Sequence, residues 1–181
     1  MNRIHIFGAS GSGVTTLGLA LGEKMGIPYF DSDSYFWEKT DPPFTHKKPP
    51  LIRNKEIKDT LHSHREWIFG GSSLSWGTDI FPDYSLVVFL KIPKEIRLQR
   101  IEKREFDRYG EAIYTDPIQR AKTREFLAWC GDYDDCTGIA NRNIKVHEHW
   151  LQNLAFPTLR IDGDFSVEQR IEIILKELKK N

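Results

Sequence analysis

Hydrophobic residues along the chain fall into short apolar runs that alternate with longer segments of mixed character. Five of the short runs are rich in β-branched, leucine or aromatic residues and end near a turn-forming residue, which is typical of buried strands. They cover residues 4–8, 29–30, 67–69, 86–90 and 158–161. The run at 86–90 is apolar throughout, as expected at the centre of a parallel sheet covered on both faces.

The longer segments carry apolar residues at helical spacing. They predict helices at residues 15–25, 53–64, 94–108 and 117–129 and a last helix after Ser166. Pro117 fits the first turn of its helix, and Ser166 with Gln169 fits a capping box. The proline-rich stretch 39–50 is typical of a loop.

Strands that alternate with helices predict parallel βαβ units and therefore a three-layer α/β fold. No internal repeat and no linker divides the sequence, so we expect a single domain over residues 1–181. The next question is which classes of function the composition excludes.

Lys and Arg together number 26, as do Asp and Glu, so the formal net charge is zero. A dedicated nucleic-acid binder needs a basic excess, which argues against nucleic-acid partners. No apolar run is long enough to cross a bilayer, and the first residues lack the apolar stretch of a signal peptide. We expect a cytoplasmic protein without a membrane partner, either a monomer or a homodimer.

A loop rich in glycine and serine follows the first predicted strand and precedes the first helix. It matches the phosphate-binding pattern GxxxxGK[ST] except at Val14, where lysine belongs. Backbone amides of such a loop cradle a phosphate, and Thr15 stands where a hydroxyl ligates magnesium. The residues expected to bind the nucleotide are Gly8, Ser10, Gly11, Ser12, Gly13, Val14, Thr15 and Thr16.

The missing lysine has a measurable consequence. A hydrogen bond to a charged group contributes roughly 1.5–3 kcal/mol. Its loss therefore weakens the state in which the lysine would contact the β- and γ-phosphates by roughly ten- to a hundred-fold. Another cation has to compensate if catalysis is retained. Lys47 and Lys48 in the proline-rich stretch are candidates, although surface positions are the more common fate of such residues.

Two carboxylates and two arginines complete the candidate site. Asp31 and Asp33 follow the second strand, where open α/β sheets bind their ligands, although Asp also favours helix caps. Arg100 and Arg104 lie four residues apart, so a helix places both on one face toward a lid cleft. The alternative for these arginines is surface ion pairing.

These features together resemble the nucleoside-monophosphate-kinase group of P-loop proteins, which includes adenylate and shikimate kinases. The resemblance implies a P-loop NTPase fold with a five-stranded parallel sheet, an acceptor-binding region at about 34–66 and a short lid at about 104–117. Asp31-x-Asp33 looks like the motif in which Asp31 helps to hold magnesium, directly or through water, while Asp33 meets the acceptor hydroxyl. Arg100 and Arg104 lie where these kinases run into their lid.

The same resemblance suggests acceptor-binding residues. Arg53 resembles the arginine that grips an acidic acceptor in shikimate kinases, and Gly70-Gly71 resembles the glycine turn that lets an acceptor approach the backbone. The triple glycine of shikimate kinase is only a pair here. Trp37 and Phe44 could sandwich an aromatic acceptor, which favours a nucleoside or nucleotide.

We therefore predict an enzyme that uses ATP and Mg²⁺ to phosphorylate a small-molecule acceptor, first of all a nucleoside or nucleotide. A shikimate- or gluconate-like acid is the alternative acceptor. A nucleotide-binding regulatory module with weak or no catalysis is the alternative from another class, and Val14 is the residue that motivates it.

Overall fold

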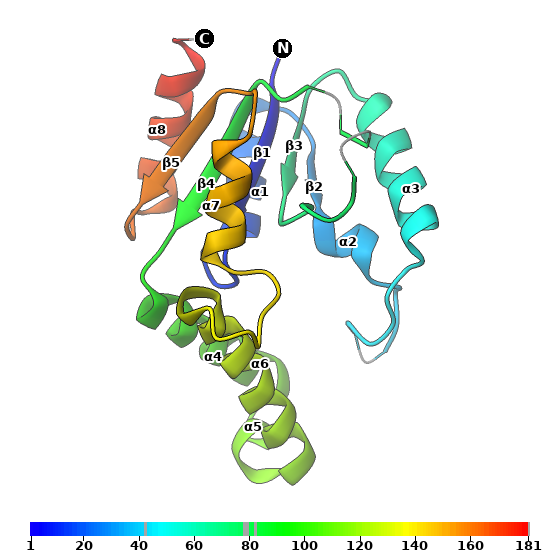
Figure 1. Cartoon of the computed structure of the whole chain (residues 1–181), viewed down its shortest axis with the longest axis vertical. Coiled ribbons are helices and arrows are strands. Elements are labelled where there is room, and N and C mark those ends of the chain that lie inside the picture. Colours follow the sequence, from blue (N-terminus) through cyan, green and yellow to red (C-terminus); the bar gives the residue numbers. More distant parts are fainter. Residues whose placement is uncertain (42, 78–79, 82, 181) are drawn as a thin grey trace.

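The five predicted strands form one parallel sheet in the order β2-β3-β1-β4-β5, as the α/β prediction requires (Figure 1). The computed structural model describes residues 1–41, 43–77, 80–81 and 83–180. Its strands are β1 (Arg3–Gly8), β2 (Tyr29–Asp31), β3 (Trp67–Gly70), β4 (Leu86–Lys91) and β5 (Thr158–Asp162). The all-parallel pairing confirms the fold class.

Helices cover both faces of this sheet and extend beyond its carboxyl edge. They are α1 (Val14–Met25), α2 (Ser32–Phe36), α3 (Pro50–His62), α4 (Lys94–Tyr109), α5 (Ala112–Thr115), α6 (Pro117–Asp135), α7 (Ile144–Gln152) and α8 (Val167–Leu178). None of the helices formed by the described residues combines the length and the apolar character needed to span a bilayer.

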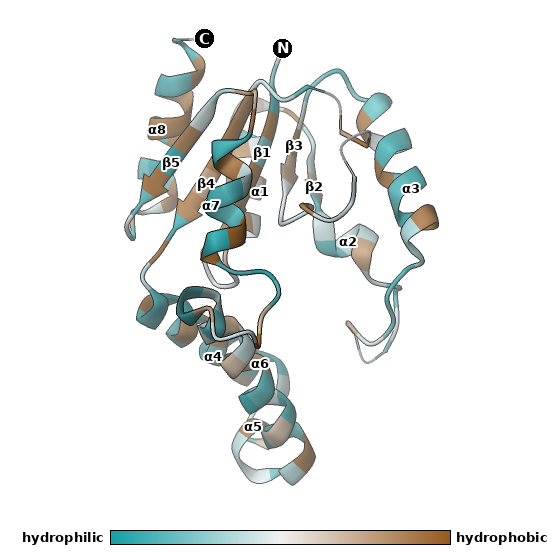
Figure 2. Cartoon of the chain, viewed as in Figure 1, coloured by the Kyte–Doolittle hydropathy of each residue, from teal (hydrophilic) through white to brown (hydrophobic). Residues whose placement is uncertain are grey.

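Alternation along the strands creates two separate cores. Ile4, Ile6 and Val88 face α1 and α8, whereas Phe7 and Phe89 face α3 and α7. Figure 1 shows α7 in front of the central strands, and Figure 2 shows the brown, hydrophobic colour concentrated along those strands. The result is the predicted three-layer arrangement, with apolar strands in the middle layer.

The helices α4, α5 and α6 lie beyond the carboxyl ends of the strands, together with α2 (Figure 1). The predicted lid, residues 104–117, comprises the end of α4, all of α5 and the first residue of α6. This edge is where the loop after β1 also emerges. The elements that carry the candidate residues therefore meet at one end of the molecule.

The helix boundaries differ from prediction in several places. α3 begins at Pro50 rather than at 53, because proline is well suited to the first turn of a helix. α6 continues to Asp135, beyond the predicted end at 129. Pro42, in the predicted loop, lies outside the described residues, and the capping box of α8 is present as predicted.

Helices α2, α5 and α7 lie outside the predicted set. α2 is a short helix whose N-cap is Asp31, and α7 is capped by Asn143. α2 and α7 each begin at a side-chain cap, whereas α5 has none, and α2 and α5 are too short to show a long apolar period. A search for helical spacing of apolar residues therefore does not detect these two helices.

Candidate active site

A cleft of about 1460 Å³ opens at the carboxyl edge of the sheet. Its walls come from the loop after β1, the end of β2, and helices α2, α4 and α6. The predicted residues that line it are Gly8, Ser10, Gly11, Ser12, Gly13, Val14, Thr15, Thr16, Asp31, Asp33, Gly71, Arg100 and Arg104. Arg53 and Gly70 do not line it.

The loop between β1 and α1 has the geometry of an anion cradle. Gly11 and Gly13 have φ angles of 81° and 87°, which favour glycine. A Cβ atom at Gly11 would lie 2.6 Å from the carbonyl oxygen of Arg97, so the loop packs closely against α4. α1 has no side-chain cap and no acidic residue in its first turn. Its first amides therefore remain available, and these residues fit a phosphate group.

Two buried arginines hold the carbonyl oxygens of this loop. Arg97 donates to the carbonyl oxygen of Ser10 over 2.9 Å, and Arg170 donates to that of Ser12 over 3.0 Å. Their exposed fractions are only 1% and 3%. The loop is consequently fixed by α4 and α8, and within it the amide of Ser12 donates to the carbonyl oxygen of Ala9 over 3.1 Å. The sequence analysis missed both arginines.

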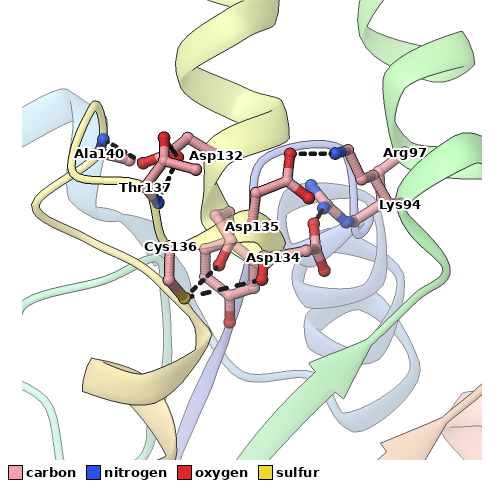
Figure 3. A network of polar contacts seen from close by, with 9 residues as sticks. Lys94, Arg97, Asp132, Asp134, Asp135, Cys136, Thr137 and Ala140 are labelled. Carbon is pink, nitrogen blue, oxygen red and sulfur yellow. Dashed lines mark hydrogen bonds and ion pairs between the residues drawn. The ribbon is translucent and has the colours of Figure 1, made fainter.

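The C-terminal turn of α6 anchors the neighbouring segments through three aspartates (Figure 3). Asp134 forms an ion pair with Arg97, and Asp135 forms one with Lys94. Asp132 accepts hydrogen bonds from the backbone amides of Ala140 and Thr137 over 2.7 and 2.8 Å.

These hydrogen bonds, together with one from the Thr137 hydroxyl, lower the pKa of Asp132 to about 2. The carboxylate is therefore ionised at neutral pH. It holds the start of the segment 136–143 in place.

Thr15 and Asp31 are in direct contact. The Thr15 hydroxyl donates to Oδ2 of Asp31 over 2.8 Å, and the Tyr29 hydroxyl donates to the same oxygen over 2.8 Å. Oδ1 of Asp31 accepts from the amide of Asp33 and so caps α2. The capping interpretation of Asp31 is thus correct, while its other carboxylate oxygen contacts Thr15.

The donor set fits magnesium but does not form a complete cage. Hydroxyl and carboxylate oxygens are ligands that Mg²⁺ accepts, and it usually completes its shell with water and substrate phosphates. Among the described residues no group of three His, Cys, Asp or Glu side chains could hold an ion by itself. Thr15 and Asp31 would hold it only together with such outside oxygens.

Asp33 is an exposed residue whose carboxyl group lies inside the cleft, where the surrounding walls reduce its hydration. Burial and the charge of Asp31 raise the pKa of Asp33, while Arg142, Arg104 and a hydrogen bond from the Trp37 side chain oppose this rise. A carboxyl group with a raised pKa in such a place can accept a proton.

Aromatic rings and a lysine form another part of the cleft wall. Phe36, Trp37, Phe44 and Trp76 all line it, as does Lys47. The Nζ atom of Lys47 lies 5.6 Å from the ring centre of Phe36 and 5.9 Å from that of Trp37.

The two lysines proposed as replacement cations differ in their surroundings. Lys48 pairs with Glu56 over 2.5 Å and does not line the cleft. Lys47 does line it, so the two neighbouring lysines occupy different environments.

Arg53 and Gly70 do not line the cleft but contact residues in or next to its wall. The guanidinium carbon of Arg53 lies 4.2 Å from the ring centre of Trp76, and this arginine is buried. A Cβ atom at Gly70 would lie 2.1 Å from the hydroxyl oxygen of Tyr29. Gly70 thus makes room for Tyr29, and Arg53 stacks on a residue of the cleft wall rather than facing the cleft.

No family model matches the chain. One curated relative, the uncharacterized protein YqaC of Bacillus subtilis (strain 168), is 38% identical over 179 residues, which cover 99% of this chain and 98% of that protein. The chain belongs to the YqaC family. The two proteins are thus related along nearly their whole length.

Solved structures show which fold this YqaC-family chain has. Deoxyadenosine kinase from M. mycoides has a TM-score of 0.57 and 19% identity, covering 99% of this chain and 100% of that one. Shikimate kinase from Acinetobacter baumannii has a TM-score of 0.58 and 19% identity, covering 100% and 94%. A gluconokinase from Sinorhizobium meliloti has a TM-score of 0.53 and 17% identity, covering 99% and 92%. The fold is that of P-loop, nucleoside-monophosphate-kinase-like proteins, as the resemblance implied.

Sequence reasoning about this YqaC-family chain also missed Arg142. It lies between α6 and α7, lines the cleft, and has its guanidinium carbon 5.1 Å from the ring centre of Trp129. Neither a motif nor a helical period marks this position. Its place in the cleft results from the fold of the segment 136–143, which brings it over Trp129 of α6.

Proposed function

We propose that this protein transfers the terminal phosphoryl group of ATP to a small acceptor, with Mg²⁺ as cofactor. The observation that carries the proposal is the hydrogen bond between Thr15 and Asp31, which joins the phosphate-cradle loop to the carboxylates after β2. Phosphoryl transfer requires positioning and charge stabilisation rather than covalent chemistry, and this cleft offers both.

Each part of the cleft has a role in the proposed reaction. The amides at the start of α1 bind the β-phosphate, and Thr15 with Asp31 holds the metal, which neutralises charge on the phosphates. Asp33 orients the acceptor hydroxyl and takes its proton as the hydroxyl oxygen bonds to the γ-phosphorus. The bond from that phosphorus to its bridging oxygen breaks, and ADP leaves. Arg104, which forms no ion pair with any described residue, stabilises the charge that spreads over the transferred group. Arg100 pairs with Asp164 and would have to exchange this partner to take the same role.

The lid segment 104–117 closes over the cleft in this proposal. Phe44 and Arg108 already approach across it, with the guanidinium carbon 5.1 Å from the ring centre. Closure of such a lid excludes water and prevents hydrolysis of ATP without transfer.

The first acceptor we propose is a nucleoside or nucleotide. Phe36, Trp37 and Phe44 line the cleft and are not buried, so they offer ring surface on which a planar base can stack. A shikimate- or gluconate-like acid is the second candidate, because Lys47 places a cation among the same rings. The two acceptor classes differ in charge and shape, so one assay separates them.

The test is a coupled assay of ADP formation with Mg²⁺, ATP and a panel of nucleosides, nucleotides and small hydroxy acids, with products checked by phosphorus NMR. We expect turnover with at least one base-containing acceptor and none with the Asp33→Asn variant. Turnover only with an acid would select the second candidate. Nucleotide binding without any turnover would indicate the regulatory module instead, and the proposed enzyme would be wrong.

A further inference from the structure

Six lysine and arginine side chains line the cleft, and four of them form no ion pair with any described residue. Two of its arginines are already paired, Arg100 with Asp164 over 2.6 Å and Arg108 with Glu105 over 3.3 Å. The cationic residues of the lining that form no ion pair with any described residue are Lys47, Arg104, Lys122 and Arg142. Only Arg142 among these is half-buried, whereas the other three are exposed.

The half-buried position of Arg142 is energetically unfavourable unless an anion pairs with its guanidinium group. Burial lowers the pKa of Arg142, and the groups that face it are Asp33, Cys130, Tyr133 and His147. None of these forms an ion pair with it in the described part of the chain. A guanidinium withdrawn from water without a bonded carboxylate is destabilising, and a bound phosphate would relieve that penalty.

Hydrogen bonds hold both ends of the segment that carries Arg142. Asp132 holds the amides of Thr137 and Ala140 on one side (Figure 3), and Ala140 is buried. On the other side Asn143 accepts a hydrogen bond from the amide of Val146 over 3.0 Å and caps α7. Arg142 thus projects from a short span that is fixed at both ends, as a preorganised ligand group would be.

Arg142 lines the same cleft as the phosphate-cradle loop and Asp33. Its charge acts on Asp33, as does that of Arg104. A phosphate bound at the loop therefore shares this cleft with Arg142. In the proposed reaction the phosphates of ATP, the terminal one included, occupy this place.

We infer that Arg142 supplies to the terminal phosphate of ATP the positive charge that a lysine at position 14 would supply, an inference that rests on the proposed function. A planar guanidinium suits this role because it can donate to two phosphate oxygens at once.

Other cations near the loop already form hydrogen bonds, ion pairs or contacts with aromatic rings. Arg97 donates to the carbonyl oxygen of Ser10 and pairs with Asp134. Arg170 donates to the carbonyl oxygen of Ser12 and pairs with Asp164.

Lys47 lies among the aromatic rings at the acceptor end. Arg104 and Lys122 are exposed, so Arg142 is the half-buried cation among those of the lining that form no ion pair with a described residue, and its segment is held at both ends. These two properties make it the best candidate to replace the missing lysine.

The experiment is calorimetric titration of the full chain with a non-hydrolysable ATP analogue and, separately, with ADP, both with Mg²⁺. In Arg142→Gln we expect roughly ten- to a hundred-fold weaker binding of the ATP analogue, the effect of one lost charged hydrogen bond, and a much smaller change for ADP. Arg142→Lys should retain most of the affinity. Lys145→Gln, an exposed cation three residues away, is the matched control.

A rescue variant makes the test specific to the missing lysine. Val14→Lys should restore the ATP-analogue affinity of Arg142→Gln by tenfold or more while adding little to the unaltered protein. If that double variant does not fold, as judged by its thermal melt, the contrast between Arg142→Gln and Arg142→Lys decides. Unchanged analogue binding in Arg142→Gln would overturn the inference and leave the proposed function standing. Failure of the unaltered protein to bind either nucleotide would overturn both.

Discussion

The hydroxyl of Thr15 and the carboxylate of Asp31 are joined by a hydrogen bond of 2.8 Å, although Thr15 follows β1 and Asp31 ends β2, two strands that are not adjacent in the sheet. β3 lies between β1 and β2, and the two residues meet only at its carboxyl end. Open α/β sheets bind their ligands in this kind of crevice. The contact therefore links the phosphate cradle to the acid groups of the proposed reaction.

Asp31→Asn should reduce the effect of magnesium on nucleotide binding. Asparagine keeps the size of the side chain but removes the charge that attracts the metal. We expect the strengthening of ATP-analogue binding by Mg²⁺ to fall by about tenfold or more, as loss of a charged interaction implies. Titrations with and without Mg²⁺ measure it, with Asp59→Asn on the surface of α3 as control. An unaltered magnesium effect would remove Asp31 from metal binding.

Asp33→Asn should abolish turnover while nucleotide affinity changes little. Loss of a general base lowers the rate by roughly 10²–10⁴-fold. Because burial and Asp31 raise the pKa of Asp33, the turnover of the unaltered enzyme should fall as the pH drops through a value above the usual 3.8. A pH–rate profile, with Asp107→Asn as a surface control, measures both points. Equal turnover in Asp33→Asn would exclude this aspartate as the base.

The strands and the phosphate-cradle loop could be predicted because their signals are local. Alternation and apolar runs identify strands, and the glycines of the loop are required by its own backbone angles. Thr15 and Asp31 were both expected at the magnesium, and the strands that lead to them end at the same edge, although their hydrogen bond itself was not predicted. These predictions did not need any knowledge of how the helices pack.

The remaining parts of the site depend on tertiary contacts that no spacing reveals. Arg97 and Arg100 lie three residues apart on α4, yet Arg97 is buried against the loop while Arg100 pairs with Asp164. Lys47 and Lys48 are neighbours, but only Lys47 lines the cleft. In each case the residue types are alike and the packing of other elements decides which one faces the site.

Arg97→Gln should destabilise the whole fold. The variant breaks the buried pair with Asp134 and removes the donor to the carbonyl oxygen of Ser10. Removing one partner of a buried pair costs about 3–5 kcal/mol, and we expect about 3 kcal/mol because Asp134 is partly exposed.

Urea unfolding measures the loss, and Lys103→Gln on the exposed face of the same helix should change stability by less than about 0.5 kcal/mol. Nucleotide binding should weaken in Arg97→Gln as well, since the loop loses a support. A loss no larger than that of Lys103→Gln would mean that the buried guanidinium contributes little to the fold.

Asp132→Asn should destabilise the protein at neutral pH and much less in acid. The pKa of Asp132 is lowered from its usual 3.8 to about 2 by the amides of Ala140 and Thr137 and by the Thr137 hydroxyl. A group with a lowered pKa in the folded state contributes stability above its unfolded pKa, and this contribution is lost as the pH falls through the folded pKa. The stability difference between the two proteins should therefore be constant above about pH 5 and shrink toward pH 2.

Urea unfolding at a series of pH values measures this difference, and Asp107→Asn should show no such trend. The same Asp132→Asn variant should bind the ATP analogue more weakly at neutral pH, because the segment 136–143 loses the anchor that positions Arg142. If stability falls as expected but analogue affinity is retained, then Asn143 and the packing of α7 suffice to place Arg142. If neither changes, Asp132 is not the anchor of this segment.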